Sequence, residues 1–249
     1  MYFNNKEEVI NKLESLQIIG DGSQGTCYLD SKKSLVYKIF HQFLDDYEFD
    51  EKIKYTCCEF LRFNHISNNT FIWPNDVINV EDEIVGYVTK YVPVRPLYTM
   101  NPLDININIL SEAIKNSQND LYILSQNGVL TFDLMYNILY GNKIYVTDCD
   151  EFSFSKKSSG KLLEINRYNF AYEFYYFLVE GYFDEFISEY HKLNKLYKDK
   201  DDDILYFITL FKKYLSEYVG YEVTHLKEAI SCLNQDNKHK RSYVRILSK

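Results

Sequence analysis

The stretch Thr131–Phe152, TFDLMYNILYGNKIYVTDCDEF, decides the fold that the sequence predicts. It contains two short runs of β-favouring residues, Ile138-Leu139-Tyr140 and Ile144-Tyr145-Val146, on either side of Gly141-Asn142. A glycine–asparagine pair between such runs is typical of a two-residue hairpin loop. The stretch therefore predicts a β-hairpin.

Three polar side chains precede or follow the strands of this predicted hairpin: Asp133, Asn137 and Asp148. A two-residue loop would set Asn137 opposite Val146, with Asp148 further along the partner strand on the same face. An amide oxygen and a carboxylate suit Mg²⁺, which keeps several waters and is usually shared with phosphates. Asp133 would be placed to accept a proton from an attacking hydroxyl. The alternative is that Asn and Asp merely flank a turn.

Residues 16–40 predict a strand, a glycine-rich loop, a second strand, a turn and a third strand. Gly20, Gly22 and Gly25 form the loop. Because a strand rather than a helix follows them, we expect the bend of a hairpin that lies over phosphate groups. Lys38 is the one charged residue of the apolar third strand, which predicts an ammonium directed at an anionic partner. The alternatives are a flexible turn and a lysine on an edge strand in water.

The composition indicates a soluble globular protein, since the 249 residues are 46% hydrophobic and 26% charged. A net charge of −8 argues against a nucleic-acid partner, because phosphate contacts need a clustered basic surface. No signal peptide or membrane-spanning run is evident, so we expect no membrane association. Five cysteines without a C-x-x-C pair favour reduced thiols in the cytoplasm, and the scattered histidines argue against a zinc site.

Together these motifs resemble those of the protein-kinase-like superfamily. That family has a glycine-rich loop, a lysine on the third strand and a glutamate on the next helix. An aspartate and an asparagine in the catalytic loop and a metal-binding aspartate after the following hairpin complete its pattern. The matching residues occur here in the family's order: Gly20, Gly22, Gly25, Lys38, Asp133, Asn137 and Asp148.

The resemblance implies an α+β, bilobal protein-kinase-like fold. Residues 1–92 would form an N-lobe with a small antiparallel sheet and one main helix, and residues 93–249 a mostly helical C-lobe with the catalytic hairpin. It also implies ATP and Mg²⁺ as cofactors, with transfer of the γ-phosphate to a hydroxyl of an unidentified protein or small molecule.

Other residue roles rest on the resemblance alone. Glu51 would pair with Lys38 and hold it on the phosphates, with Glu48 and Glu59 as alternatives. Backbone groups at the end of the next long strand would bind the adenine edge. The residues expected in that part of the nucleotide site are Thr89, Lys90 and Val92.

Several further elements are predicted. Residue patterns indicate helices over residues 4–16, 45–63 and 105–126 and strands over residues 71–74 and 84–93. Asn127-Gly128 predicts a helix C-cap. By the resemblance, the central helix of the C-lobe would start at Asn166, where the family has an aspartate.

The chain departs from the family pattern in its catalytic stretch. The spacing from Asp133 to Asn137 is one residue shorter, and Met135 stands where a protein kinase has lysine. Asp148 is followed by Cys-Asp in place of Phe-Gly, so Asp150 is either a further metal ligand or a turn residue. These departures leave a second interpretation open, a pseudokinase that serves as a nucleotide-binding or protein-interaction module.

Overall fold

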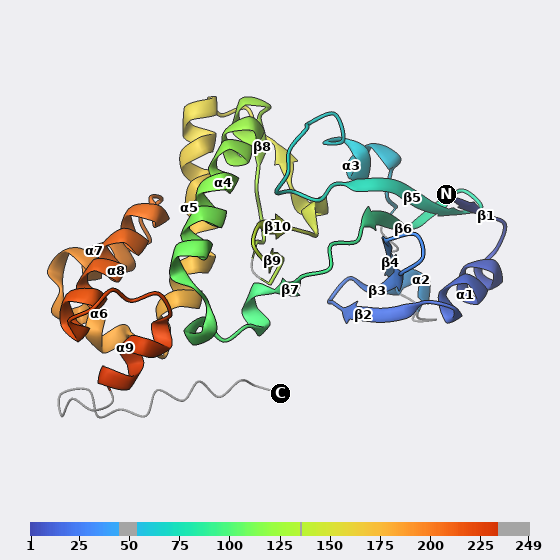
Figure 1. Cartoon of the computed structure of the whole chain (residues 1–249). Helices are drawn as coiled ribbons and strands as arrows, with labels where there is room; N and C mark the ends of the chain where they lie inside the picture. Colours follow the sequence, from blue (N-terminus) through green and yellow to red (C-terminus); the bar gives the residue numbers. More distant parts are fainter. Residues whose placement is uncertain (45–53, 135, 234–249) are drawn as a thin grey trace. The chain divides into compact units, whose positions relative to one another are not determined.

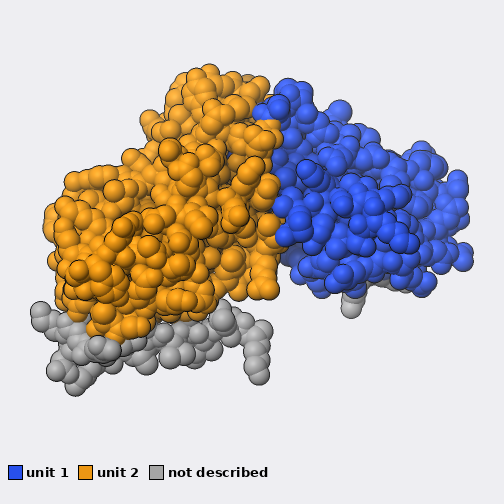
Figure 2. Space-filling model, in the orientation of Figure 1, with its two compact units in different colours: residues 1–67, 71–93, 147–150 blue, residues 68–70, 94–146, 151–249 orange. Residues whose placement is uncertain are grey.

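The computed structural model describes residues 1–44, 54–134 and 136–233, which form two compact units, coloured separately in Figure 2. Unit 1 consists of residues 1–67, 71–93 and 147–150, and unit 2 of residues 68–70, 94–146 and 151–249. The chain passes between the units more than once, whereas the predicted lobes divide it at a single point.

A six-stranded sheet lies at the centre of unit 1 (Figure 1), with the strand order β1-β5-β6-β4-β3-β2. β1 is parallel to β5, and the other neighbouring strands are antiparallel. The bounds are β1 Tyr2–Phe3, β2 Gln17–Asp21, β3 Gly25–Asp30, β4 Leu35–Phe40, β5 Pro74–Val80 and β6 Glu83–Lys90. The predicted order of strand, glycine loop, strand, turn and strand is confirmed by β2, β3 and β4.

One face of this sheet is covered by helix α1 (Lys6–Glu14), which confirms the first predicted helix. Tyr37 and Ile39 of β4 belong to one buried cluster with Val9 and Leu13 of α1. Because side chains alternate along a strand, the residues between and beyond them point to the other face.

The opposite face carries a second cluster, in which Phe40 of β4 and Tyr87 of β6 pack with Phe60 of helix α3 (Cys57–Leu61). The alternation along β4 places Lys38 on this face as well. A lysine is thereby set among aromatic side chains rather than at the edge of the sheet.

The strand predicted over residues 71–74 is wrong, because β5 begins only at Pro74. Phe71 and Trp73 form a buried aromatic cluster instead, with their rings stacked at 5.9 Å and the Trp73 ring 5.3 Å from that of Phe63. The Trp73 indole N–H donates to a backbone carbonyl at 2.9 Å. The loop before β5 therefore contributes buried aromatic side chains to the core of unit 1.

The helix predicted over residues 45–63 lies partly outside the described residues. Helix α2 (His41–Leu44) precedes that segment, and α3 forms its described end. Glu59 accepts a hydrogen bond from the Thr56 backbone N–H, the capping arrangement that begins a helix. Glu59 thus caps its own helix.

Helices make up most of unit 2. They are α4 Ile107–Gln126, α5 Ser159–Val179, α6 Asp184–Glu189, α7 His191–Asp199, α8 Ile204–Val219 and α9 Leu226–Leu233. The two long helices α4 and α5 pack together (Figure 1). Asn127 caps α4 and Gly128 follows with φ of 75°, so the predicted C-cap is confirmed. Across the described residues, none of the helices combines the length and apolar character that crossing a bilayer requires.

Helix α5 begins at Ser159 rather than at Asn166, so the predicted start is wrong. The reason is the N-cap: the Ser158 hydroxyl accepts a hydrogen bond from the Lys161 backbone N–H at 3.4 Å. Asn166 therefore lies inside the helix, where it is fully buried.

Unit 2 also contains five short strands among its described residues. β7 (Arg95–Pro96), β9 (Ile138–Tyr140) and β10 (Ile144–Val146) form one small sheet, and β8 (Val129–Leu130) pairs with β11 (Ser153–Phe154). The 3₁₀ turns are η1 Leu97–Thr99, η2 Pro102–Asp104 and η3 Cys149–Glu151.

The predicted hairpin exists as β9 and β10, but its register is shifted by one residue. Ile138, not Asn137, lies opposite Val146, because the loop has three residues, 141–143. Gly141 closes it by donating its N–H to the Lys143 carbonyl at 3.0 Å. A one-residue shift moves a side chain to the other face of the pair, so the face expected for Asn137 was wrong.

Candidate functional site

Lys38 is held between two neighbouring strands. It lies opposite Cys27 of β3 and opposite Tyr87 of β6, and only 6% of its surface is exposed. Beside Tyr87, Gly86 lies opposite Ile39, and a Cβ at Gly86 would overlap the Lys38 carbonyl. The two strands thus pass closely at the lysine.

Two carboxylates meet the Lys38 ammonium. Asp148 accepts a short charged hydrogen bond from Lys38 Nζ through Oδ1, and Oδ2 of Asp150 lies 3.6 Å from the same nitrogen. The Tyr87 hydroxyl donates to Asp148 Oδ1 at 2.7 Å, and the Tyr87 ring centre is 5.4 Å from the ammonium. Together, Lys38, Tyr87, Asp148 and Asp150 form what we call the lysine cluster.

Burial disfavours every charge in the lysine cluster, and the ion pairs oppose it. At Lys38 the nearby carboxylates outweigh burial, so its pKa lies above the usual value. At Asp148 the charge and hydrogen bond of Lys38 likewise outweigh burial and lower the pKa. Burial, aided by the charge of Asp148, raises the pKa of Asp150 to about 6. One carboxylate is therefore firmly ionised and the other titrates close to neutral pH.

Asp150 is part of the lysine cluster through its side chain, which is only 9% exposed. Its backbone is fixed as well, because Arg62 donates to the Asp150 carbonyl at 2.8 Å. The sequence did not decide between a metal ligand and a turn residue for Asp150. In the structure its carboxylate points toward Lys38 and belongs to the lysine cluster.

The lysine cluster suits Mg²⁺ by its donor set. Within the part of the chain that the structure describes, no three His, Cys, Asp or Glu side chains gather into a metal-binding group. Mg²⁺ needs fewer protein ligands when phosphates and waters complete its octahedron. Asp148 and Asp150 both lie beside the Lys38 ammonium, so two carboxylates are close together. Two carboxylates are a sufficient protein contribution to such a Mg²⁺ site.

The glycine loop is the bend between β2 and β3, where the Gly22 N–H donates to the Gly25 carbonyl at 3.0 Å. Gly20 and Gly22 are exposed. Gly25 is buried against β4, and a Cβ there would overlap the Ile39 carbonyl. Gly25 is therefore required by strand packing, and its role toward phosphates stays a prediction.

Asp21 lies in the same bend with its side chain 69% exposed. Its carboxylate accepts a 2.7 Å hydrogen bond from the Thr26 hydroxyl and lies 3.1 Å from His41 Nε2. The bond from Thr26, followed by that from His41, lowers the pKa of Asp21. The glycine loop thus carries a negative charge where β2 ends.

The residues expected at the adenine edge lie at the end of β6. Thr89 is opposite Val36 and Lys90 is opposite Leu35. After the strand, the Tyr91 N–H donates to the Ser34 carbonyl at 2.9 Å, and Val92 is partly buried. Their contact with a base stays a prediction.

Asp133 and Asn137 belong to unit 2 and are joined locally, because the Asn137 amide donates to the Asp133 carbonyl at 2.9 Å. The backbone between them is tight: φ is 44° at Asp133 and 67° at Tyr136. Asp148, in unit 1, also has positive φ, 57°. Left-handed backbone at non-glycine residues is uncommon and concentrates at functional sites. A metal ion shared by Asn137 and Asp148 stays a prediction.

Asn166 anchors the segment before Asp133. Its Oδ1 accepts from the Thr131 N–H at 2.9 Å and from the Thr131 hydroxyl at 3.0 Å. Its amide donates to the Ser125 hydroxyl at 3.0 Å and to the Val129 carbonyl at 2.8 Å. Sequence reasoning noted Asn166 only as a helix start and missed this role.

Of the glutamates considered for Lys38, Glu51 and Glu48 lie outside the described residues, as does Met135. Tyr87 was missed altogether. Tyr87 lies on the strand that pairs with the Lys38 strand. Predicting its contact with Asp148 would have required the register of β4 against β6.

No protein-family model matches the chain, and no curated protein matches it. One solved structure that does match is a chain from the structure of the CAK complex of Chaetomium thermophilum bound to ATP-γ-S. The match has 12% identity and a TM-score of 0.44, and it covers 62% of this chain but 53% of that one. A likeness at this level carries no weight for function.

Proposed function

We propose that the chain is an ATP- and Mg²⁺-dependent phosphotransferase of the protein-kinase-like superfamily, which transfers the γ-phosphate to a hydroxyl of a protein or small molecule. The observation that carries this proposal is the buried Lys38 ammonium paired with Asp148 and Asp150. Phosphoryl transfer needs a cation that binds phosphate oxygens and carboxylates that hold Mg²⁺. Lys38 would supply the first, and Asp148 and Asp150 the second.

In the proposed reaction, the acceptor oxygen forms a bond to the γ-phosphorus as the bond to the bridging oxygen breaks and ADP leaves. Asp133 takes the hydroxyl proton. Lys38 binds phosphate oxygens, and the glycine loop with Gly20 and Gly22 lies over them, because glycine lets the backbone come close. Asp148, with Asp150 or Asn137, would hold Mg²⁺, which neutralises phosphate charge when bound.

The test is ATP turnover by the full chain, with the label at the γ-phosphate, in the variants Lys38→Met and Asp148→Asn. We expect both variants to reduce turnover at least a hundredfold, because each substitution removes a charge that stabilises the transition state. Lys32→Met is the matched control, since Lys32 is exposed in the neighbouring turn. Full turnover in both variants would refute the proposal. In a parallel assay with the label at the α-phosphate, label on the acceptor together with release of pyrophosphate would indicate nucleotidyl transfer instead.

A second candidate is a pseudokinase that binds nucleotide or a protein partner without transferring phosphate. The observation that favours it is Asp21, whose exposed carboxylate lies in the glycine loop and repels phosphate. Mg-ATP binding in a thermal-shift assay, without turnover, would support this candidate. Asp21→Asn would then tighten nucleotide binding without producing turnover.

A further inference from the structure

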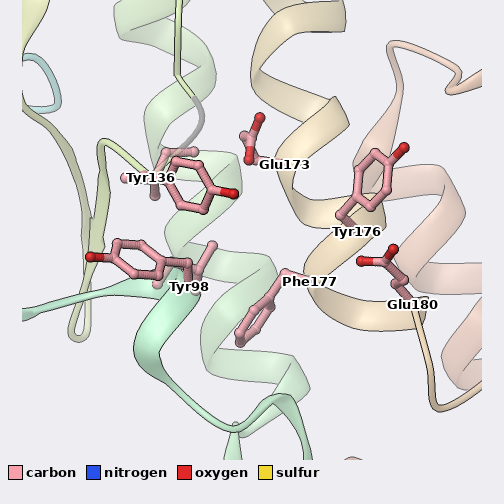
Figure 3. Close-up of a pocket in the computed structure, with 8 residues that line it drawn as sticks. Tyr98, Tyr136, Glu173, Tyr176, Phe177 and Glu180 are labelled. Carbon is pink, nitrogen blue, oxygen red and sulfur yellow. The ribbon is translucent and has the colours of Figure 1, made fainter. Parts of the chain in front are cut away.

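Unit 2 contains a small pocket between the 3₁₀ turn η1, the loop after Asp133 and helix α5 (Figure 3). It encloses about 110 Å³. Its main lining residues are Tyr98, Tyr136, Glu173, Tyr176, Phe177 and Glu180. Neither the catalytic roles above nor the lysine cluster involves these side chains.

The lining of the pocket carries negative charge. Glu173 and Glu180 are its ionisable acids, and the lining contains no Lys, Arg or His. Burial, and then the charge of Asp133, raises the pKa of Glu173 to about 7. Asp133 therefore lies near enough for its charge to act on Glu173, and the two carboxylates repel each other. A cation beside Glu173 would relieve this repulsion.

Aromatic rings supply most of the remaining lining, beside the aliphatic Leu97 and Ile138. Tyr98 and Tyr136 meet edge to face with ring centres 5.0 Å apart, and both are largely exposed. Figure 3 shows this pair facing Glu173 and Phe177 of α5, with Tyr176 one turn along the same helix. Tyrosine faces attract cations, most strongly where water is partly excluded.

The chain itself shows an ammonium held by tyrosines, Tyr176 of α5 and Tyr197 of α7. Lys200 Nζ lies 3.3 Å from the ring centre of Tyr197 and 5.1 Å from that of Tyr176. Glu180 adds an attractive charge to that lysine. Lys200 thus partly balances Glu180, whereas the charge that acts on Glu173 is the negative charge of Asp133.

We propose that this pocket binds an alkylammonium group of the phosphate acceptor, with Glu173 as its counter-ion and the rings of Tyr98, Tyr136 and Tyr176 as its walls. The proposal rests on the proposed phosphotransferase and names the chemistry of its acceptor. The small volume suits one ammonium group and its methylene neighbours. The charge of the lining excludes a phosphate or carboxylate in the same place.

The binding test needs no nucleotide. The probes are 4-aminobutan-1-ol, a cation at pH 7.5, and pentan-1-ol, which has the same shape with a methyl group in place of the ammonium. We expect the cation to bind the full chain at least tenfold more tightly in an NMR titration. Equal affinity for the two probes would overturn the proposal.

Variants test the pocket residues one at a time. We expect Glu173→Gln and Tyr176→Leu each to weaken binding of 4-aminobutan-1-ol about tenfold, because each removes one attraction to the cation. Glu164→Gln is the control, since Glu164 is an exposed carboxylate of the same helix that pairs with Lys161. Glu173→Gln with unchanged affinity for the cation would contradict the assignment.

A final arm separates the pocket from the transfer reaction. Labelled Mg-ATP is supplied with 4-aminobutan-1-ol or with a serine–lysine dipeptide, which distinguishes a free amino alcohol from a lysine side chain as the source of the ammonium. Labelled product from either one supports the proposal, and Lys38→Met should abolish that product while cation binding persists. Cation binding with no labelled product would overturn the acceptor role, and ATP turnover with other acceptors would then show that the phosphotransferase itself survives.

Discussion

The Tyr87 hydroxyl and the Lys38 ammonium donate to the same oxygen, Oδ1 of Asp148. Asp148 is thereby oriented by a neutral donor and a charged donor that lie opposite each other on neighbouring strands. The tyrosine contributes position and hydrogen bonding, and the lysine contributes charge.

Tyr87→Phe is expected to lower the free energy of unfolding by about 1–2 kcal/mol, because the ring stays and only the bond to a charged acceptor is lost. Urea denaturation measures the change. Tyr122→Phe, at an exposed position of α4, should leave stability unaltered. A Tyr87→Phe variant as stable as the parent would mean that the hydroxyl does not support Asp148.

Lys38→Met should destabilise the chain by about 3–5 kcal/mol near pH 8, because it leaves two carboxylates without their cation. Loss of the cation raises the folded-state pKa of Asp148 and Asp150 above the unfolded value, so the destabilisation is present above that raised pKa and fades as the pH falls and both groups take up protons. Denaturation at pH 5 and pH 8 tests this. Adding Asp150→Asn should restore part of the stability at pH 8, and no restoration would count against the pairing.

Asn166→Ala should cost about 2–4 kcal/mol, because buried groups of Thr131 and Val129 lose their partners. Asn166→Asp is the sharper variant. It keeps the acceptor for Thr131 but loses the donors to Ser125 and Val129 and buries a charge. We expect it to be destabilised more at pH 8 than at pH 5. Asn169→Ala, beside it on α5 and partly buried, is the milder comparison.

The stability of the chain should depend on pH through Glu173, whose folded-state pKa of about 7 exceeds the ordinary glutamate pKa of 4.5. A raised carboxyl pKa means that stability falls as the pH rises from about 4.5 through about 7. Glu173→Gln removes this loss and should be more stable than the parent by about 1–2 kcal/mol at pH 8, allowing for solvent screening. The difference should vanish near pH 4.5. Equal pH profiles for the two proteins would exclude the effect.

How much of this site could be foreseen varies with the distance between its parts in the sequence. Lys38 in an apolar strand is a local signal, and the strand exists as expected. The hairpin was also foreseen, but its register was not, because Gly141-Asn142 fits both a two-residue and a three-residue loop.

The missed residues depend on packing between segments. Tyr87 joins the lysine cluster only because β6 pairs with β4 in one register. Asn166 reaches Thr131 only because α5 begins a full two turns earlier than the motif suggested. The sequence left open whether Asp150 is a metal ligand or a turn residue, because only the folded chain brings its carboxylate beside Lys38. None of these contacts has a periodicity or spacing that marks it in the sequence.

The close passage at Gly86 has a consequence for recognising distant relatives. A side chain at that point would force apart the strands that bring Lys38 and Tyr87 together, so the dipeptide Gly86-Tyr87 is tied to the pair Lys38-Ile39 by sheet geometry. Chains that share this architecture but no detectable similarity should keep a glycine–aromatic pair facing their lysine strand. That coupled signature offers a search criterion where overall identity has faded.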